Sequence, residues 1–306
     1  MAALVGNILV AATKFAAAWW TGSSAMLSEA VHSTVDTLNE VLLLYGMRRA
    51  RKEPNERHPL GYGREIYFWS FVVAVLVFAL GAGISIYEGV QHVLEPQETT
   101  DVVVAYAVFG LSLLFEGASL AVAVRNFRRD NPRGGLLSAV RRSKDPSGFT
   151  VLLEDGAAVI GILIALGFTA LQQETGIGSL DGWASILIGF VLAATAMLLA
   201  RETKALLIGE AASPSMVARI REALARFPAL DRDAMLTIHI GPDEIVVATP
   251  LTSQAAMSAR QLEATLQDVE RAARAAVPEV RSVYLMPRPS GPQAPASPAA
   301  ARERGA

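Results

Sequence analysis

Six separate runs of mostly apolar residues, each about 20 residues long, constrain the fold of this chain more than any other feature. A helix of about 20 residues spans the hydrocarbon core of a bilayer, so each run is long enough to cross a membrane. The runs are residues 2–20, 25–47, 65–89, 102–127, 149–171 and 183–200. The sequence therefore predicts a membrane all-α fold, a bundle of six transmembrane helices over residues 1–200.

The composition agrees with a membrane protein and excludes several other classes. Of the 306 residues, 52% are hydrophobic and 18% are charged, whereas soluble domains carry about a quarter charged residues. The net charge of −2 gives no basic surface for nucleic acid. The chain has no cysteine, so disulfides and thiolate metal sites are excluded. The first 20 residues lack a basic region and a cleavage site, so we expect a retained helix and no signal peptide.

The loops between the runs alternate between strongly basic and free of basic residues. Residues 48–64 and 128–144 each contain six Lys or Arg side chains. Residues 21–24, 94–100 and 172–180 contain none. Basic loops stay on the cytoplasmic side, so we predict that both termini are cytoplasmic. The Ala- and Arg-rich composition without a targeting segment indicates a bacterial inner (cytoplasmic) membrane.

After Arg201 the pattern becomes that of a small α+β domain. Ser213-Pro214 is typical of a helix start, and apolar residues then recur at helical spacing up to Phe227. Strands are predicted at 236–240, 244–251 and 280–286, with a second helix at 262–273. The order α-β-β-α-β predicts helices packed on one sheet over residues 201–287. Residues 288–306 are rich in Pro, Ala and Ser, so we expect a disordered tail.

Ionisable residues inside the predicted spans are the strongest functional signal, because charge within a bilayer is costly. The second run contains Glu29, His32, Asp36 and Glu40, whose spacing places them on one helix face. His32 and Asp36 offer an imidazole nitrogen and a carboxylate oxygen, which suit zinc and related ions.

The fifth run adds two adjacent carboxylates, Glu154 and Asp155. Two neighbouring helices then bring one imidazole and three carboxylates into a shielded cavity. An amphipathic helix with incidental acids is the alternative, but it does not explain a second acidic pair in another span. We therefore predict a metal site made of His32, Asp36, Glu154 and Asp155.

Other charged residues carry weaker signals. Glu116 in the fourth run is either an acid of the ion pathway or a packed structural group. Lys14 is predicted to snorkel or to form an ion pair. His58 is a weaker candidate for a metal site with Asn55 or Glu56, and a capping or structural role is the alternative.

Three motifs give the chain a family resemblance. Residues 22–36 (GSSAMLSEAVHSTVD) resemble the second-helix signature of the cation diffusion facilitator family. Residues 58–64 (HPLGYGR) resemble the loop before its third helix, and residues 207–210 (LIGE) resemble its junction to the cytoplasmic domain. The resemblance implies a Y-shaped homodimer, six spanning helices and a metallochaperone-like, ferredoxin-like cytoplasmic domain that holds the dimer. It also implies exchange of a divalent metal ion for protons, with no permanently bound cofactor.

The resemblance places the transport site at His32 and Asp36 on the second helix and at Asp155 on the fifth. The family's remaining ligand falls on Val151, which cannot bind a metal ion. Glu154 is the candidate substitute, and a water molecule is the alternative. Zinc is the family's commonest substrate, but an acid in place of His favours harder ions. Mn(II), Fe(II) and Co(II) therefore remain open as substrates.

Two functions of other classes also remain open. An HxxxD motif such as His32–Asp36 occurs in acyltransferases, so an intramembrane enzyme is one alternative. A membrane scaffold that transports nothing is the other. Neither explains Glu154 and Asp155, so we predict a transporter and no enzyme.

His239 is the single histidine after residue 200. It falls opposite Leu236, Ile238 and Ile240 on its predicted strand, so we expect it to face solvent or a dimer partner. Relatives that bind regulatory metals in this domain use several histidines, so regulatory metal binding is not expected.

Overall fold

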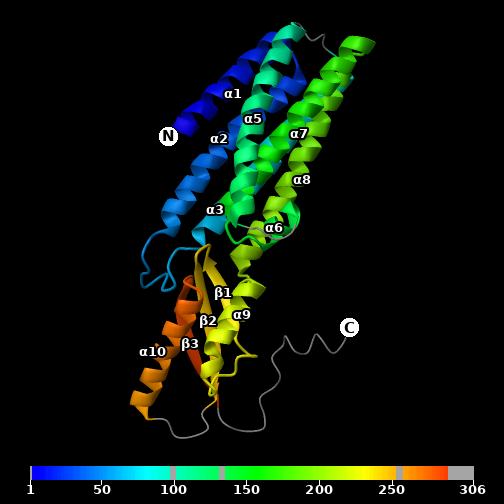
Figure 1. The fold of residues 1–306 in the computed structure, drawn as a ribbon. Helices are drawn as coiled ribbons and strands as arrows, with labels where there is room; N and C mark the ends of the chain where they lie inside the picture. The colour runs from blue at the N-terminus through cyan, green and yellow to red at the C-terminus, as the bar shows by residue number, and fades with distance from the viewer. Residues whose placement is uncertain (1, 97–100, 131–134, 253–257, 289–306) are drawn as a thin grey trace. The chain divides into compact units, whose positions relative to one another are not determined.

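The computed structural model describes residues 2–96, 101–130, 135–252 and 258–288. The chain divides into two compact units, residues 1–207 and residues 208–306. Figure 1 shows the first unit as a bundle of long helices and the second as a small sheet with helices.

The first unit is entirely helical. Its elements are α1 (Ala2–Thr21), α2 (Ser24–Ala50), α3 (Glu65–Leu76), the π-helical turn η1 (Val77–Ala82), α4 (Gly83–Leu94), α5 (Val102–Asp130), α6 (Leu136–Arg142), α7 (Pro146–Thr175) and α8 (Leu180–Ile208). Residues 65–94 continue through η1 as one helix. Long helices therefore cover all six predicted apolar runs, and most extend past the predicted ends.

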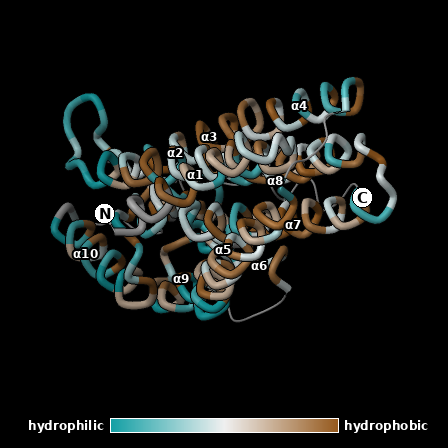
Figure 2. The backbone as a smooth tube through the Cα atoms, turned by 90° about the horizontal axis from the view of Figure 1, so that it is seen from above, coloured by the Kyte–Doolittle hydropathy of each residue, from teal (hydrophilic) through white to brown (hydrophobic). Residues whose placement is uncertain are grey.

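Four of the described helices are long and apolar enough to cross a membrane: residues 65–94, 102–129, 146–175 and 180–208. Residues 8–21 of α1 form a shorter apolar helix. The helix α2 is less apolar because its polar residues lie within the predicted span. Figure 2 shows hydrophobic residues along α3 and α7, whereas α10 is mostly hydrophilic. The chain is therefore a multi-pass membrane protein.

The helices α1, α2, α7 and α5 form a closed ring of neighbours. α1 packs on α2, α2 on α7, α7 on α5, and α5 on α1. α2 also contacts α3, η1 and α4, so it is surrounded on several sides. A helix with a polar face can persist in such a position because its neighbours satisfy that face.

A carboxylate of α8 holds the beginning of α2. Asp181 accepts hydrogen bonds from the Ser23 hydroxyl (2.6 Å), the Ser24 amide (2.5 Å) and the Ser24 hydroxyl (2.8 Å). The Ser23 hydroxyl in turn accepts from the Met26 amide, as an N-cap residue does. An anion at a helix N-terminus is also stabilised by the helix dipole. Asp181 therefore fixes the end of the helix that carries His32 and Asp36.

Glycines let α4 and α8 approach closely. A Cβ atom on Gly89 would lie 2.7 Å from the backbone oxygen of Gly182, and one on Gly189 would lie 2.5 Å from Ile86. Small residues at helix contacts are a common means of packing within membranes.

The second unit contains α9 (Pro214–Ala223), the 3-10 turn η2 (Leu224–Arg226), β1 (Leu236–Gly241), β2 (Glu244–Thr252), α10 (Ala259–Ala276) and β3 (Val280–Arg288). The order of strands in the sheet is β1-β2-β3, with β1 antiparallel to β2 and β2 parallel to β3. The elements follow the predicted order α-β-β-α-β. The predicted disordered tail falls, from residue 289 on, outside the described residues.

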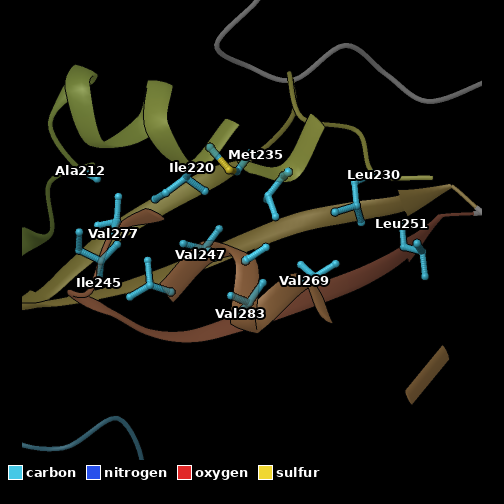
Figure 3. Packing of buried hydrophobic residues seen from close by; sticks show 14 residues of the cluster. Ala212, Ile220, Leu230, Met235, Ile245, Val247, Leu251, Val269, Val277 and Val283 are labelled. Atoms are coloured by element: carbon cyan, nitrogen blue, oxygen red, sulfur yellow. The ribbon is translucent and has the colours of Figure 1, made fainter. Parts of the chain in front are cut away.

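The core of the second unit lies between the sheet and its helices. Figure 3 shows Ile220 of α9 and Val269 of α10 near Val247 and Val283 of the sheet. These apolar side chains form one buried cluster, which also contains Ile245.

The prediction for His239 was wrong, because its side chain is fully buried. His239 pairs with Ile245, and Thr237 pairs with Val247, so both lie on the core face of the sheet. On the opposite face Leu236 is 58% exposed, whereas Ile240 is buried. Alternation along a strand shows which residues share a face, but the tertiary packing decides which face is covered.

We expect Gly89→Ala to lower the thermal stability of the protein and Gly110→Ala to leave it unchanged or raise it. Both glycines lie inside helices, so both changes gain up to about 1 kcal/mol of helix propensity. The added methyl group clashes with backbone at Gly89 but meets nothing within 4 Å at Gly110. Loss of helical circular dichroism on heating in detergent measures the difference. Equal midpoints would show that α4 and α8 are not closely packed.

Candidate metal site

His32 and Asp36 lie together on one face of α2. His32 is 1% exposed, and its Nε2 atom lies 3.5 Å from Oδ2 of Asp36. Within the described structure neither ring nitrogen of His32 has a hydrogen-bond partner, nor does Oδ1 of Asp36. Buried polar atoms are normally hydrogen-bonded, so these groups suit a binding role better than a structural one.

The two carboxylates of α7 point toward different helices. Asp155 accepts a hydrogen bond of 2.7 Å from the Ser119 hydroxyl of α5. Glu154 is buried and accepts a hydrogen bond of 2.6 Å from the side-chain amide of Asn39 on α2. Adjacent residues on a helix are about 100° apart, which explains the divergence. Both carboxylates nevertheless lie within electrostatic range of Asp36.

A cavity of about 120 Å³ lies where α1, α2, α5 and α7 meet. All four helices contribute to its wall, which consists of Val10, Ser33, Asp36, Phe115, Glu116, Ser119 and Asp155. A water molecule occupies about 30 Å³ in the liquid, so the cavity has room for one ion and a few waters. Three carboxylates and two hydroxyls face this space, which gives it the oxygen ligands that divalent cations prefer.

The predicted ligands are close to one another but do not form a closed set. Across the described residues, no three His, Asp or Glu side chains meet in a group that could hold a metal ion. His32 and Asp36 form one pair, Asp155 lines the same cavity as Asp36, and Glu154 accepts a hydrogen bond from Asn39. Binding an ion with all four side chains therefore requires them to move toward each other.

His58 lies in the exposed loop between α2 and α3. Its backbone amide donates to the side-chain oxygen of Asn55 at 2.9 Å. Its ring packs edge-on against Tyr62 with the ring centroids 4.4 Å apart. Tyr62 also accepts a hydrogen bond of 2.7 Å from Asn55. These contacts hold a turn together.

Several residues around the cavity were not predicted to act there. For Glu116 the sequence allows either a pathway acid or a packed structural group, and Ser33 and Ser119 were not predicted as site residues. Ser119 follows Glu116 by three residues, so the helix period places both on one face of α5. That spacing is the signal that could have found the serine.

The predicted ion pairing of Lys14 is confirmed. Its Nζ atom lies 2.8 Å from the Ser33 hydroxyl, 3.4 Å from Glu29 and 3.7 Å from Glu116. The residue is buried, so it does not snorkel to the membrane surface.

A multi-pass helical unit with a buried imidazole beside a carboxylate-lined cavity is typical of membrane proteins that handle cations. The family model described as the cation efflux transmembrane domain matches residues 1–208. The chain therefore belongs to the cation efflux family, as the resemblance to cation diffusion facilitators predicted.

Three curated relatives support this membership. The chain is 38% identical to the human mitochondrial proton-coupled zinc antiporter SLC30A9 over 233 residues, which are 75% of this chain and 41% of that protein. It is 38% identical to the Xenopus laevis protein of the same name over 216 residues, 70% of this chain and 39% of that protein. It is 35% identical to metal tolerance protein C4 of Arabidopsis thaliana over 232 residues, 75% of this chain and 50% of that protein. The matched part thus covers half or less of each relative.

The role of Glu154 can be separated from that of its partner Asn39. If Glu154 is a ligand, Glu154→Gln should weaken zinc binding about as much as Asp155→Asn, by more than about tenfold. Asn39→Ala removes the hydrogen bond alone and should have a smaller effect. Isothermal titration of the detergent-solubilised protein measures the three dissociation constants. Small and equal effects of Glu154→Gln and Asn39→Ala would show that Glu154 has a structural role. A water molecule would then be the remaining ligand of the ion.

Proposed function

We propose that this protein exports a divalent metal ion, zinc first, in exchange for protons. The observation that carries the proposal is the pair of buried His32 and half-buried Asp36 in the membrane unit, with three buried polar atoms that lack hydrogen-bond partners in the described structure. Membership of the cation efflux family supports this function. The names of the human and frog relatives, proton-coupled zinc antiporters, support both the metal and the counter-ion.

The proposed transport site consists of His32, Asp36, Asp155 and Glu154. One imidazole and three carboxylates can provide the four nitrogen and oxygen ligands of a tetrahedral zinc site. The substrate ion enters the cavity beside Asp36 and Asp155 and draws the remaining ligands toward it. His58 is a weaker candidate because its contacts already hold a turn.

Proton exchange follows from the chemistry of these ligands. Imidazole and carboxylate groups bind either a proton or a metal ion, so metal binding releases protons and protonation releases the metal. Histidine changes its charge near physiological pH, so His32 is the natural proton carrier. A proton supply outside the cell then drives release of the ion there.

The proposed organisation follows the chain in order. Residues 1–200 form the six-helix transmembrane domain, in which α1 and α2 also cross the bilayer. Residues 201–287 form a cytoplasmic αββαβ domain that holds a homodimer. The basic residues of 48–64 and 128–144 support a cytoplasmic location for both termini, and an inner bacterial membrane is the proposed location.

Manganese is the strongest alternative substrate within the family. Asp36, Glu116 and Asp155 face the cavity together with two serine hydroxyls, and oxygen ligands favour harder ions such as Mn(II). His32 is the single nitrogen ligand of the proposed site and favours zinc. Parallel flux measurements with Zn, Mn, Fe, Co and Cd in proteoliposomes decide between these ions.

Replacing His32 or Asp36 with Ala should abolish zinc flux into proteoliposomes. Loss of one of four metal ligands costs more than the 10–100-fold that is typical for an outer partner of a ligand. Expression and size-exclusion profile should stay unchanged. His58→Ala is the matched control and should transport normally. Normal flux in Asp36→Ala would refute the site.

Zinc flux should respond to a pH difference across the proteoliposome membrane. Acid on the side that receives the metal should accelerate transport, because protons displace zinc from imidazole and carboxylate ligands. The measurement uses a zinc-sensitive dye inside vesicles with the membrane potential clamped. Flux that follows voltage but ignores the pH difference would indicate a uniporter.

A further inference from the structure

A lysine is fully buried inside the membrane unit, next to the cavity. Lys14 of α1 is 1% exposed. Its ammonium group donates to the Ser33 hydroxyl of α2 and lies near Glu29 of α2 and Glu116 of α5. A buried cation is costly unless it is paired, so this arrangement is a specific feature of the fold.

The partners of Lys14 fall into two groups. Ser33 and Glu116 line the cavity together with Asp36 and Asp155, whereas Glu29 is not part of its wall. The Lys14 ammonium group therefore does not line the cavity itself. It lies between Glu116, which lines the cavity, and Glu29, which does not. The distances to the two carboxylates are similar, 3.7 Å to Glu116 and 3.4 Å to Glu29.

The Glu29 carboxylate can accept a further hydrogen bond from the Lys14 ammonium group. In the described structure its Oε1 atom is buried and has no hydrogen-bond partner. That atom lies against Gly161 of α7, where an added Cβ would come within 2.5 Å of it. The glycine thus leaves room for the Glu29 carboxylate, and Lys14 can be held by Glu29 alone.

We propose that Lys14 is a built-in counter-cation that competes with the transported ion for Glu116. This inference rests on the proposed function and adds Glu116 to the carboxylates that attract the ion. When the cavity holds a divalent ion, Coulomb repulsion moves the ammonium group toward Glu29 and leaves Glu116 to the ion. When the ion departs, the ammonium group neutralises Glu116 again, so Lys14 weakens binding and promotes release.

The alternative is a purely structural ion pair, and the two roles predict opposite changes in metal affinity. A structural lysine holds α1, α2 and α5 together, so its removal should loosen the cavity and weaken binding. A competing cation opposes the ion, so its removal should strengthen binding and slow release. Metal affinity therefore distinguishes the roles even if stability falls in both cases.

The test compares zinc binding by the full-length parent, Lys14→Met and Lys14→Arg in detergent. Calorimetric titration should give Lys14→Met a dissociation constant at least about tenfold lower, because Glu116 then lacks the cation that lies 3.7 Å from it in the parent. Lys14→Arg keeps the charge and should bind like the parent. Zinc flux in proteoliposomes should fall in Lys14→Met, because release becomes slow.

Two further variants link the effect to its proposed cause. In the background of Glu116→Gln, Lys14→Met should tighten binding less than it does in the parent, because the contested carboxylate is absent and only direct repulsion of the ion by Lys14 remains. Arg49→Met removes the membrane unit's ion pair between Arg49 and Glu65, whose atoms lie 2.8 Å apart and do not line the cavity. This control should leave zinc affinity unchanged.

If Lys14→Met does not fold, a double variant that removes one positive and one negative side chain can be tested instead. Lys14→Met/Glu29→Gln removes both members of one ion pair, and it should also bind zinc more tightly than the parent. Unchanged or weaker binding in the folded variants would overturn the role of Lys14. If His32→Ala abolishes binding in the same assay, the proposed function survives that result. A parent protein that binds no divalent metal would overturn both.

Discussion

The high free energy of an unpaired charge inside a bilayer governs the arrangement of the membrane unit. α2 carries acidic residues and a histidine within a predicted span, so it needs polar partners from its neighbours. Lys14 of α1 pairs with Glu29, and Asn39 donates to Glu154 of α7. These pairs lie where neighbouring helices of the ring α1, α2, α7 and α5 contact each other.

This pairing is complete in some places and incomplete in others. Glu154 and Asp155 each accept a hydrogen bond from a neighbouring helix. His32 keeps two buried ring nitrogens without hydrogen-bond partners in the described chain, and it lies beside Asp36. Buried polar atoms without hydrogen-bond partners destabilise the fold. A bound cation that they ligate can offset this destabilisation.

Hydrogen bonds to Asp181 fix the N-terminal end of α2. Asp181 accepts three hydrogen bonds of 2.5–2.8 Å from Ser23 and Ser24, and α8, which carries it, packs closely on α4 through glycines. Side chains near the cavity can then rearrange around an ion while the backbone of α2 stays fixed. A transport site needs this combination, because its ligands must both converge on an ion and release it.

The sequence by itself determined the apolar runs, the order of elements in the second unit and the polar residues His32, Asp36, Glu154 and Asp155. These follow from local periodicity and from the cost of charge in a membrane. The tertiary structure decided that Asp155 meets Ser119 and Glu154 meets Asn39. It also decided that His239 is buried and that Lys14 reaches two carboxylates. Periodicity fixes which residues share a face of one element, but the rotation of each element against its neighbours depends on packing between residues far apart in the chain.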